Sequence, residues 1–256
     1  MTRAQRRSSV PSLPPPSSID AREVAQFAAL AQEWWDPEGR FAPLHRLNPL
    51  RLSFVRDLAA RHFDRDPVLL RPFSELSLLD VGCGGGLLAE PVARQGFSVL
   101  GIDAAEDGIA AAVAHAAETE LRPAYRCATA EALEAEGASF DVVIAMEIVE
   151  HVADRAVFLR ACAALVKPGG LLFVATIART LKALALAKFG AEYVLGWVPA
   201  GTHDWRKFVS PGALSIEIEG CGLEVFAVQG VAFDPLAWDW RLSADTDVNY
   251  MLAARK

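Results

Sequence analysis

The chain has 256 residues, of which 52% are hydrophobic and 22% are charged, an ordinary globular balance that allows one α/β domain with a sizeable core. Its formal net charge of -7 argues against a nucleic-acid partner, because proteins that bind the phosphate backbone concentrate Lys and Arg. The four cysteines lie far apart without a Cys-x-x-Cys pair. Their spacing argues against a structural zinc site or a redox dithiol and favours a reduced, cytoplasmic setting.

The N-terminal segment 1–18 contains arginines and then a run rich in Ser and Pro. It has no long apolar stretch, so it has the features of neither a secretory signal nor a transmembrane span. A segment of this composition buries too little apolar surface to offset the entropy lost on ordering, and we expect a disordered tail. The remaining residues, 19–256, are predicted to form a single domain.

Residues 19–66 are predicted to form an N-terminal helical cap. Ser18 or Asp20 can serve as the N-cap of a first helix, in which apolar residues recur at roughly helical spacing. The WWDPEG segment that follows ends this helix. Residues 43–49 are then expected to form a loop and residues 50–63 a second helix.

From residue 76 onward, short apolar strands alternate with helical stretches. Strands are predicted at residues 76–81, 98–102, 124–127, 140–146, 171–176, 223–228 and 248–253, and helices at residues 87–95, 107–118 and 155–165. Such alternation is typical of a parallel sheet with helices on both faces. The last two strands are joined without a convincing helix, so we expect them to pair as an antiparallel edge. The sequence therefore predicts an α/β fold with a mostly parallel, seven-stranded sheet.

A glycine-rich turn follows the first predicted strand, where residues 79–86 read LDVGCGGG. Glycines at such a turn let the backbone approach a ligand closely, and the helix N-terminus adds free N–H groups. Asp80 precedes the first glycine by two residues, and an anionic residue there suits a cationic ligand better than the pyrophosphate of a dinucleotide. S-adenosylmethionine carries an ammonium and a sulfonium group, and Asp103, at the end of the second strand, can bind both ribose hydroxyls. The alternatives are that Asp80 only caps the turn, or that the protein is a dinucleotide-dependent dehydrogenase.

The motifs that follow the turn resemble those of the class I S-adenosylmethionine-dependent methyltransferases. Besides the turn and Asp103, the resemblance rests on FDVV at 140–143, MEIVEHV at 146–152 and LVKPGG at 165–170. Many methyltransferases share these motifs, so they indicate the class alone. The class implies a Rossmann-like fold, in agreement with the predicted sheet and its antiparallel C-terminal edge.

Four further segments are more specific. They are WWDPEGRF at 34–41, PLHRLNPLR at 43–51, GAEY at 190–193 with VP at 198–199 and GTHD at 201–204, and DVNYM at 247–251. These segments resemble the ubiquinone-biosynthesis O-methyltransferase family, and the resemblance covers residues 20–256. It implies an enzyme that methylates a catechol hydroxyl of a polyprenylated benzenediol early in the pathway and of a demethylubiquinol in the last step.

The resemblance also implies which residues contact the cofactor. Arg51 would bind the methionine carboxylate through two hydrogen bonds, and a solvated arginine on a helix face is the alternative. Residues 128–130 read ATA after the third strand, where many relatives of the wider class carry an acidic residue. The predicted cofactor-binding residues are Arg51, Asp80, Gly82, Gly84, Asp103, Ala130 and Met146.

Three residues after the fourth strand are candidates for catalysis and for metal binding: Glu147, Glu150 and His151. A catechol hydroxyl has a pKa of about 10, so a general base or a metal must remove or stabilise its proton. If this stretch is helical, residues three and four apart share a face, and the three side chains would converge at the carboxyl end of the sheet. Oxygen and nitrogen ligands allow Mg²⁺ or Zn²⁺, and the family resemblance favours Mg²⁺. The alternative is that this Glu–His pair only shapes the cofactor wall, as in many methyltransferases.

Residues 177–209 are predicted to form an insertion, because a plain class I sheet needs only one helix at this point. The stretch 180–198 is apolar with its charges on one arc, but glycines and charges make it too broken to span a bilayer. We expect either a substrate lid packed on the core or an interfacial helix with Tyr193 and Trp197 at the level of the lipid headgroups. Since a polyprenyl tail resides in the bilayer, peripheral association with the inner membrane from the cytoplasm is expected.

His203, in a Gly-Thr-His-Asp loop, is a further catalytic candidate, although a lone loop histidine is usually solvated. The expected partners are a polyprenylated catechol or quinol substrate and other ubiquinone-biosynthesis proteins. Two other functions stay open on the sequence alone. A C- or N-methyltransferase for another small molecule would keep the cofactor site without a base for a phenol, and a non-catalytic module would only bind S-adenosylmethionine.

Overall fold

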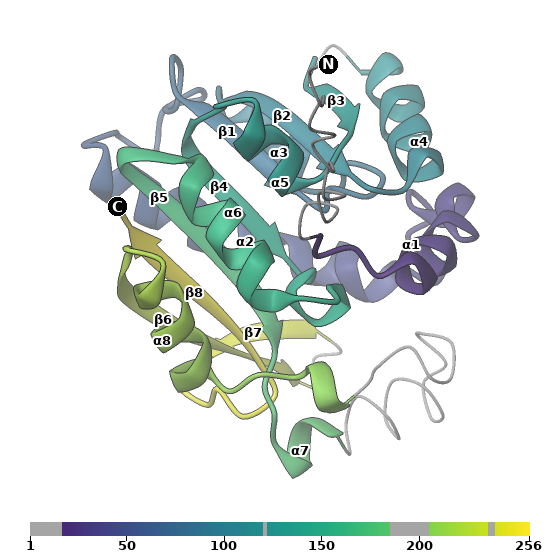
Figure 1. The fold of residues 1–256 in the computed structure, drawn as a ribbon. Helices are drawn as coiled ribbons and strands as arrows, with labels where there is room; N and C mark the ends of the chain where they lie inside the picture. Colours follow the sequence, from purple (N-terminus) through teal and green to yellow (C-terminus); the bar gives the residue numbers. More distant parts are fainter. Residues whose placement is uncertain (1–16, 120–121, 185–204, 235–238) are drawn as a thin grey trace, which may run out of the picture.

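The protein is built around one eight-stranded sheet with helices on both faces (Figure 1). The computed structural model describes residues 17–119, 122–184, 205–234 and 239–256. The strands are β1 (Ser77–Val81), β2 (Ser98–Asp103), β3 (Ala124–Cys127), β4 (Phe140–Met146), β5 (Val166–Ile177), β6 (Glu224–Asp234), β7 (Asp239–Ser243) and β8 (Asn249–Arg255). Their order across the sheet is β3-β2-β1-β4-β5-β8-β6-β7.

The first five strands are parallel to one another, and the last three form an antiparallel edge. This confirms the predicted α/β class with its C-terminal antiparallel edge. All seven predicted strands are present, and β7 is an eighth that pairs with the end of β6. Its sequence, DWRLS, lies in a largely exposed hairpin, so it lacks the apolar pattern that marks a buried strand.

The helices and short 3₁₀ turns complete the chain. They are α1 (Ala21–Ala28), η1 (Ala31–Glu33), α2 (Ala42–His62), α3 (Ala89–Arg94), α4 (Glu106–Ala117), α5 (Ala130–Ala135), η2 (Val149–His151), α6 (Arg155–Leu165), α7 (Leu181–Leu184), η4 (Trp205–Lys207) and α8 (Pro211–Gly220). Among the described residues, no helix combines the length and the apolar character needed to cross a bilayer.

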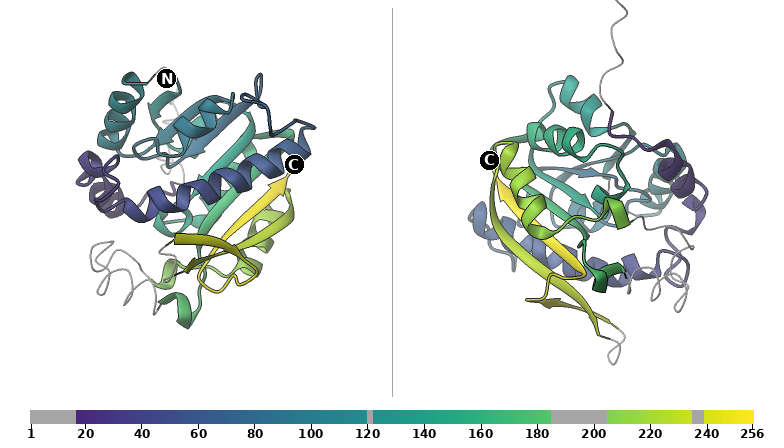
Figure 2. Two further views of the ribbon diagram at one scale, coloured as in Figure 1. Left: turned by 180° about the vertical axis from the view of Figure 1, so that it is seen from behind. Right: turned by 60° about the horizontal axis from the view of Figure 1, so that its bottom comes forward.

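Two apolar cores lie on the two faces of the sheet, because successive side chains of a strand point to opposite sides. In β4, Val143 and Ala145 pack with α5, α6 and α8, whereas Val142 and Ile144 pack with α2 and α3. Figure 2 shows α2 crossing the face of the sheet that is hidden in Figure 1. The sheet is thus covered on both sides, and its carboxyl edge remains for a ligand.

The helix α2 differs from the prediction, because it already begins at Ala42 where a loop was expected. Pro43 is compatible with the first turn of a helix, where its missing N–H would have no partner. Pro49 lies inside the helix, which continues because Leu47 and Phe54 on either side of it are buried in the core. Tertiary packing therefore keeps residues 43–49 helical, although the two prolines favour a loop there.

The N-terminal helix α1 begins as predicted, with the Asp20 side chain accepting a hydrogen bond from the backbone N–H of Arg22. Ser18, at the end of the predicted tail, is buried, and its backbone joins two elements of the domain. Its N–H donates to Glu131 Oε1 over 2.9 Å, and its carbonyl accepts from the N–H of Ala153 over 2.8 Å. The chain before residue 17 and most of the predicted insertion, including Tyr193 and Trp197, lie outside the described residues.

Candidate active site

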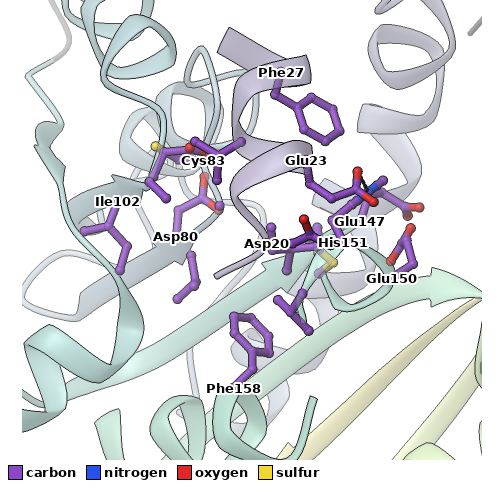
Figure 3. A pocket seen from close by; sticks show the side chains of 18 of the residues that line it. Asp20, Glu23, Phe27, Asp80, Cys83, Ile102, Glu147, Glu150, His151 and Phe158 are labelled. Atoms are coloured by element: carbon purple, nitrogen blue, oxygen red, sulfur yellow. Dashed lines mark hydrogen bonds and ion pairs between the residues drawn. The ribbon is translucent and has the colours of Figure 1, made fainter. Parts of the chain in front are cut away.

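A cavity of about 230 Å³ opens at the carboxyl ends of β1, β2 and β4 (Figure 3). Its floor includes Asp80 and Asp103, and its wall includes Met146 and Glu147. Parallel strands bring these four residues together, since all their carboxyl ends meet at one edge of the sheet. Of the seven predicted cofactor residues, Arg51, Asp80, Gly82, Asp103, Ala130 and Met146 line the cavity, and Gly84 does not.

The glycine-rich turn packs against Trp34, which also lines the cavity, and against Trp35. Gly82 and Gly84 have φ angles of 74° and 50°, in the left-handed region that favours glycine. A Cβ atom on Gly84 would lie 2.3 Å from Trp34 Cζ2, and one on Gly85 would lie 2.5 Å from Trp34 Cβ. Trp35 Nε1 donates to the carbonyl of Gly85 over 2.8 Å. The turn therefore needs glycine partly because the Trp-Trp segment packs directly on its backbone.

Asp103 links the end of β2 to the same turn. Its Oδ2 accepts from the N–H of Gly84 over 2.9 Å, and its Oδ1 accepts from the N–H of Ala105 over 2.8 Å. Burial raises the pKa of this carboxyl, although the backbone hydrogen bonds act in the opposite direction. Each carboxylate oxygen can accept a further hydrogen bond, so Asp103 is held in place for a diol at the cavity floor.

Arg51 and Asp80 are buried and carry polar atoms that lack hydrogen-bond partners among the described residues, namely Arg51 Nε and Nη2 and Asp80 Oδ2. Arg51 is 4% exposed, so the alternative of a solvated surface arginine is wrong. Burial raises the pKa of Asp80 to about 7, and Arg51 only partly offsets this effect. Unpaired buried groups of opposite charge fit a ligand with an ammonium and a carboxylate, the amino-acid end of S-adenosylmethionine.

Glu147, Glu150 and His151 all line the cavity, but the segment that carries them is not the predicted helix. Glu147 has a φ of 55°, and residues 149–151 form the single 3₁₀ turn η2. The left-handed Glu147 turns the chain sharply after β4, and its N–H donates to the carbonyl of Ala175 over 2.9 Å. A tight turn, and not helical periodicity, brings the three side chains to one place.

Each of the three residues has a different partner. Glu147 Oε1 lies 3.8 Å from Arg51 Nη2, an ion pair too long for a hydrogen bond, and burial raises the pKa of Glu147 to about 7. Glu150 Oε2 accepts from Thr176 Oγ1 over 2.6 Å. His151 Nδ1 lies 3.1 Å from Glu23 Oε2. Burial alone would lower the pKa of His151, but Glu23 and the two neighbouring carboxylates raise it above its ordinary value.

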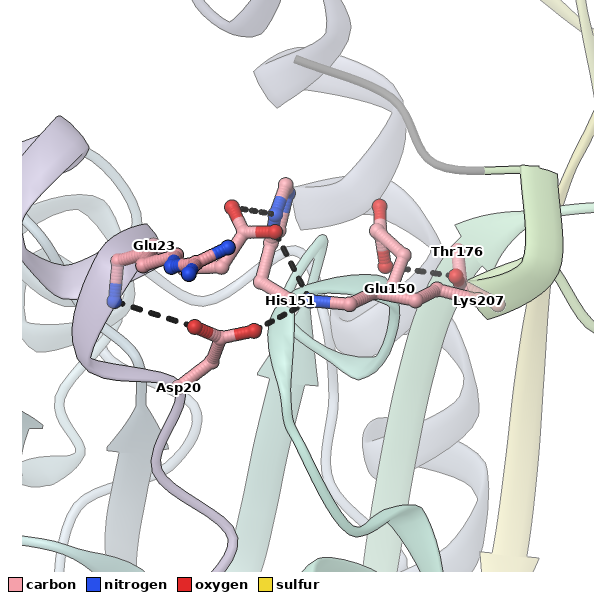
Figure 4. A network of polar contacts seen from close by, with 7 residues as sticks. Asp20, Glu23, Glu150, His151, Thr176 and Lys207 are labelled. Atoms are coloured by element: carbon pink, nitrogen blue, oxygen red, sulfur yellow. Dashed lines mark hydrogen bonds and ion pairs between the residues drawn. The ribbon is translucent and has the colours of Figure 1, made fainter. Parts of the chain in front are cut away.

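The contact between Glu23 and His151 belongs to a polar network that sequence reasoning missed (Figure 4). Lys207 Nζ, in η4, donates to Asp20 Oδ2 over 2.8 Å and to Glu23 Oε1 over 2.9 Å. The network joins α1, η2 and η4, which are far apart in the chain. No local motif marks such residues. His203, the other predicted candidate, lies outside the described residues.

The predicted metal ligands are Glu147, Glu150 and His151. Glu147 and Glu150 are neighbouring carboxyls, and the charge of Glu150 adds to burial in raising the pKa of Glu147. Both side chains offer the oxygen ligands that a divalent cation such as Mg²⁺ prefers. Within the described residues, however, no three His, Cys, Asp or Glu side chains are already arranged around a metal position. The donor types therefore fit a Mg²⁺ ion, while the arrangement shown pairs them with protein groups.

Comparisons with known proteins agree with this site. Residues 79–174 match the family model of a methyltransferase domain. The chain is 58% identical over 243 residues to a ubiquinone biosynthesis O-methyltransferase of Caulobacter vibrioides, covering 94% of this chain and 96% of that protein. It is 53% identical over 240 residues to the protein of the same name from Parvibaculum lavamentivorans, covering 94% and 95% of the two chains.

Solved structures show the same fold at low sequence identity. The magnesium protoporphyrin IX methyltransferase of Synechocystis with bound SAH superposes with a TM-score of 0.62 at 18% identity, covering 91% of this chain and 94% of that chain. A possible histamine N-methyltransferase of Thermotoga maritima gives a TM-score of 0.59 at 18% identity, covering 91% and 99%.

The fold, the acidic floor and the glycine-rich turn define a class I S-adenosylmethionine-dependent methyltransferase. The dehydrogenase alternative is therefore wrong. Within that class, the chain belongs to the ubiquinone biosynthesis O-methyltransferase family, with which it shares more than half of its residues over nearly its whole length. It is an S-adenosylmethionine-dependent O-methyltransferase.

Proposed function

We propose that this enzyme transfers the methyl group of S-adenosylmethionine to a catechol hydroxyl of polyprenylated benzenediol and demethylubiquinol intermediates of ubiquinone biosynthesis. The observation that carries the proposal is the composition of the cavity. Asp80 and Asp103 form an acidic floor, Phe27 and Phe158 belong to an apolar wall, and His151 lies at the same cavity (Figure 3). A charged cofactor and an aromatic, apolar acceptor need these two environments side by side.

The cofactor would be held by groups of opposite charge at its two ends. Asp80 would pair with the ammonium group and Arg51 with the carboxylate, which would give partners to their unpaired buried atoms. Asp103 would accept the ribose hydroxyls while the turn holds it in place. Ala130 and Met146 line the cavity and would contact the remainder of the cofactor.

The transfer step needs a deprotonated acceptor. The phenolate oxygen forms the new bond to the methyl carbon while the carbon–sulfur bond breaks and its electron pair stays on sulfur. The hydroxyl proton passes to His151 or to Glu147, which both line the cavity. A general base typically contributes about 10²–10⁴-fold to such a step. Because a phenolate and a sulfonium form two neutral products, a water-poor apolar wall favours the reaction.

A divalent cation is part of this proposal. A Mg²⁺ ion would be held by Glu147, Glu150 and His151. When bound, such an ion would lower the pKa of a hydroxyl that coordinates it. The neighbouring carboxyls supply the oxygen ligands that Mg²⁺ prefers, and a bound cation would oppose the charge of Glu150, one of the causes that raise the pKa of Glu147. With its Nε2 bound to the cation, His151 would not take the hydroxyl proton.

Peripheral contact with the inner membrane from the cytoplasm is the second part of the proposal, together with contacts to other ubiquinone-biosynthesis proteins. It is supported by the chemistry of a polyprenyl tail and by the apolar sequence of residues 180–198. Replacing Leu184 and Phe189 with Asp should abolish flotation with anionic liposomes while leaving the affinity for S-adenosylmethionine unchanged. Unaltered flotation of the double variant would rule out this segment as the contact.

The reaction itself is tested with labelled S-adenosylmethionine and a short-chain prenyl catechol, with Mg²⁺ or with a chelator. We expect label on oxygen in the wild-type protein, and loss of transfer in the Asp80→Asn variant. Transfer that is unaffected by the chelator would remove the metal from the proposal but not the base. Label on carbon or nitrogen, or none on any catechol or quinol, would refute the proposed substrate class.

A further inference from the structure

The N-terminal helix α1 reaches His151 with two side chains of one helical face. Glu23 and Phe27 are four residues apart, so they lie one above the other on that face. Glu23 Oε2 lies 3.1 Å from His151 Nδ1. The Phe27 ring meets the His151 ring edge to face, with centroids 4.9 Å apart and planes at 85°. The imidazole thus contacts a carboxylate at one nitrogen and packs at a right angle against an aromatic ring.

The contact at Nδ1 determines which nitrogen is left for chemistry. A carboxylate at Nδ1 requires a proton on that nitrogen, so the neutral ring carries its lone pair on Nε2. This nitrogen is the one that a substrate hydroxyl or a metal ion would use. With its side chain 10% exposed, His151 has little access to bulk water that would replace Glu23 as a partner.

Glu23 is itself held by both of its oxygens. While Oε2 faces His151, Oε1 accepts from Lys207 Nζ over 2.9 Å. Lys207 also donates to Asp20, the N-cap of α1, over 2.8 Å. Asp20 and Glu23 therefore anchor the same helix to the same lysine, and only Glu23 reaches the imidazole (Figure 4). Substituting the two residues one at a time can therefore distinguish the anchoring of α1 from the orientation of His151.

We propose that Glu23 is a positioning residue for methyl transfer, which fixes the ring orientation and the Nδ1–H tautomer of His151 so that Nε2 serves the reaction. The inference rests on the proposed function through the role of His151. It holds whether Nε2 takes the proton or binds a cation, because histidine ligands also donate their other N–H to a carboxylate or carbonyl. Glu23 lies 128 residues before His151, so no sequence motif joins them.

The test compares Glu23→Ala with Asp20→Asn in the full chain. Both variants remove one carboxylate from Lys207, and Asn keeps an N-cap on α1. We expect Glu23→Ala to lower kcat by about 10–100-fold, the usual loss when the partner of a working histidine is removed, with the cofactor Kd changed by less than about threefold. Asp20→Asn should change kcat by less than about threefold, because Asp20 does not contact His151 and a partly exposed ion pair contributes little.

A direct readout of the tautomer makes the test independent of activity. Nitrogen-15 NMR at a pH where the ring is neutral should show His151 as the Nδ1–H form in the wild type and as a mixture in Glu23→Ala. The chain has five histidines, and the signal of His151 is assigned by its loss in His151→Asn. These spectra decide the inference even if no acceptor is methylated, which would refute the proposed function alone.

Two results would overturn the inference. An unchanged tautomer ratio in Glu23→Ala would mean that Glu23 does not select the proton position. Equal losses of kcat in Glu23→Ala and Asp20→Asn would mean that both carboxylates act only by tying α1 to Lys207.

Discussion

Replacing Gly84 with Ala tests how the Trp-Trp segment packs on the cofactor turn. Gly84 has a φ of 50°, and its Cβ would lie 2.3 Å from Trp34 Cζ2 and 2.4 Å from Cη2. Trp34 cannot simply retreat, because its other side is stacked on Phe41 with ring centroids 3.8 Å apart. Ordinary carbon contacts are about 3.5–4.0 Å, so the indole must move by more than about 1 Å.

Two costs then add up in the Gly84→Ala variant. The left-handed backbone costs an alanine about 1–2 kcal/mol, and overpacking a core costs about 1–3 kcal/mol. The free energy of unfolding should therefore fall by about 2–5 kcal/mol, a large share of the about 5–15 kcal/mol that stabilises a typical domain. S-adenosylmethionine binding should weaken in the same variant, since Gly84 N–H is the donor that holds Asp103.

The matched control is Gly169→Ala. Gly169 has a φ of 77° and nothing within 4 Å of a Cβ, so this variant carries the backbone cost without the clash. Urea unfolding of both variants, and of Gly84→Ala combined with Trp34→Ala, separates the two contributions. We expect a coupling of about 1–3 kcal/mol between Gly84 and Trp34. If Gly84→Ala were no less stable than Gly169→Ala, or if the two changes at the turn were additive, the packing argument would be refuted.

Three further predictions concern the buried charges and the late strand. The pKa of Asp80 is about 7 in the free protein, and pairing with an ammonium group would lower it. Cofactor binding should therefore release a proton, and the affinity should increase as the pH rises toward about 7. Calorimetry over this range should show no such trend for Asp80→Asn. Arg51→Met should lower the free energy of unfolding by about 3–5 kcal/mol above a pH of about 8, because it leaves buried carboxylates without their cation. The loss should be smaller at a pH of about 5, where Asp80 and Glu147 are protonated. An equal loss at both pH values in urea titrations would contradict this. Tyr250→Phe removes a buried 2.9 Å hydrogen bond to the carbonyl of Val209 and should cost about 0.5–1.5 kcal/mol by thermal unfolding, without changing cofactor affinity.

The residues proposed to bind the cofactor near the glycine-rich turn could be read from the sequence, because they lie in one strand–turn–helix unit and at the end of the next strand. Asp80, Gly82 and Asp103 are placed by local chain geometry together with the parallel order of the strands, and both leave clear patterns. Arg51 followed from the family resemblance and proved to be buried, although the helix that carries it was predicted to begin eight residues too late, at 50 instead of 42.

The arrangement of the candidate catalytic residues could be read only in part. Glu147, Glu150 and His151 were found as residue types, but the helix expected to align them is a 3₁₀ turn entered through a left-handed residue. Backbone geometry of this kind depends on how β4 ends against β5, where Glu147 N–H meets the carbonyl of Ala175. A sequence pattern with a period of 3.6 residues contains no information about such a pairing.

The sequence by itself determined the alternation of strands and helices, the glycine-rich turn and the two acidic residues beside it, because hydrophobic periodicity and turn chemistry act between near neighbours in the chain. Only the tertiary structure decided which surface groups meet at the reaction site. Lys207 and Glu23 are 184 residues apart and come together because α1 and η4 converge on the turn after β4. Contacts between such distant residues depend on how the elements pack in three dimensions, and local sequence does not encode them in any pattern that can be read in advance.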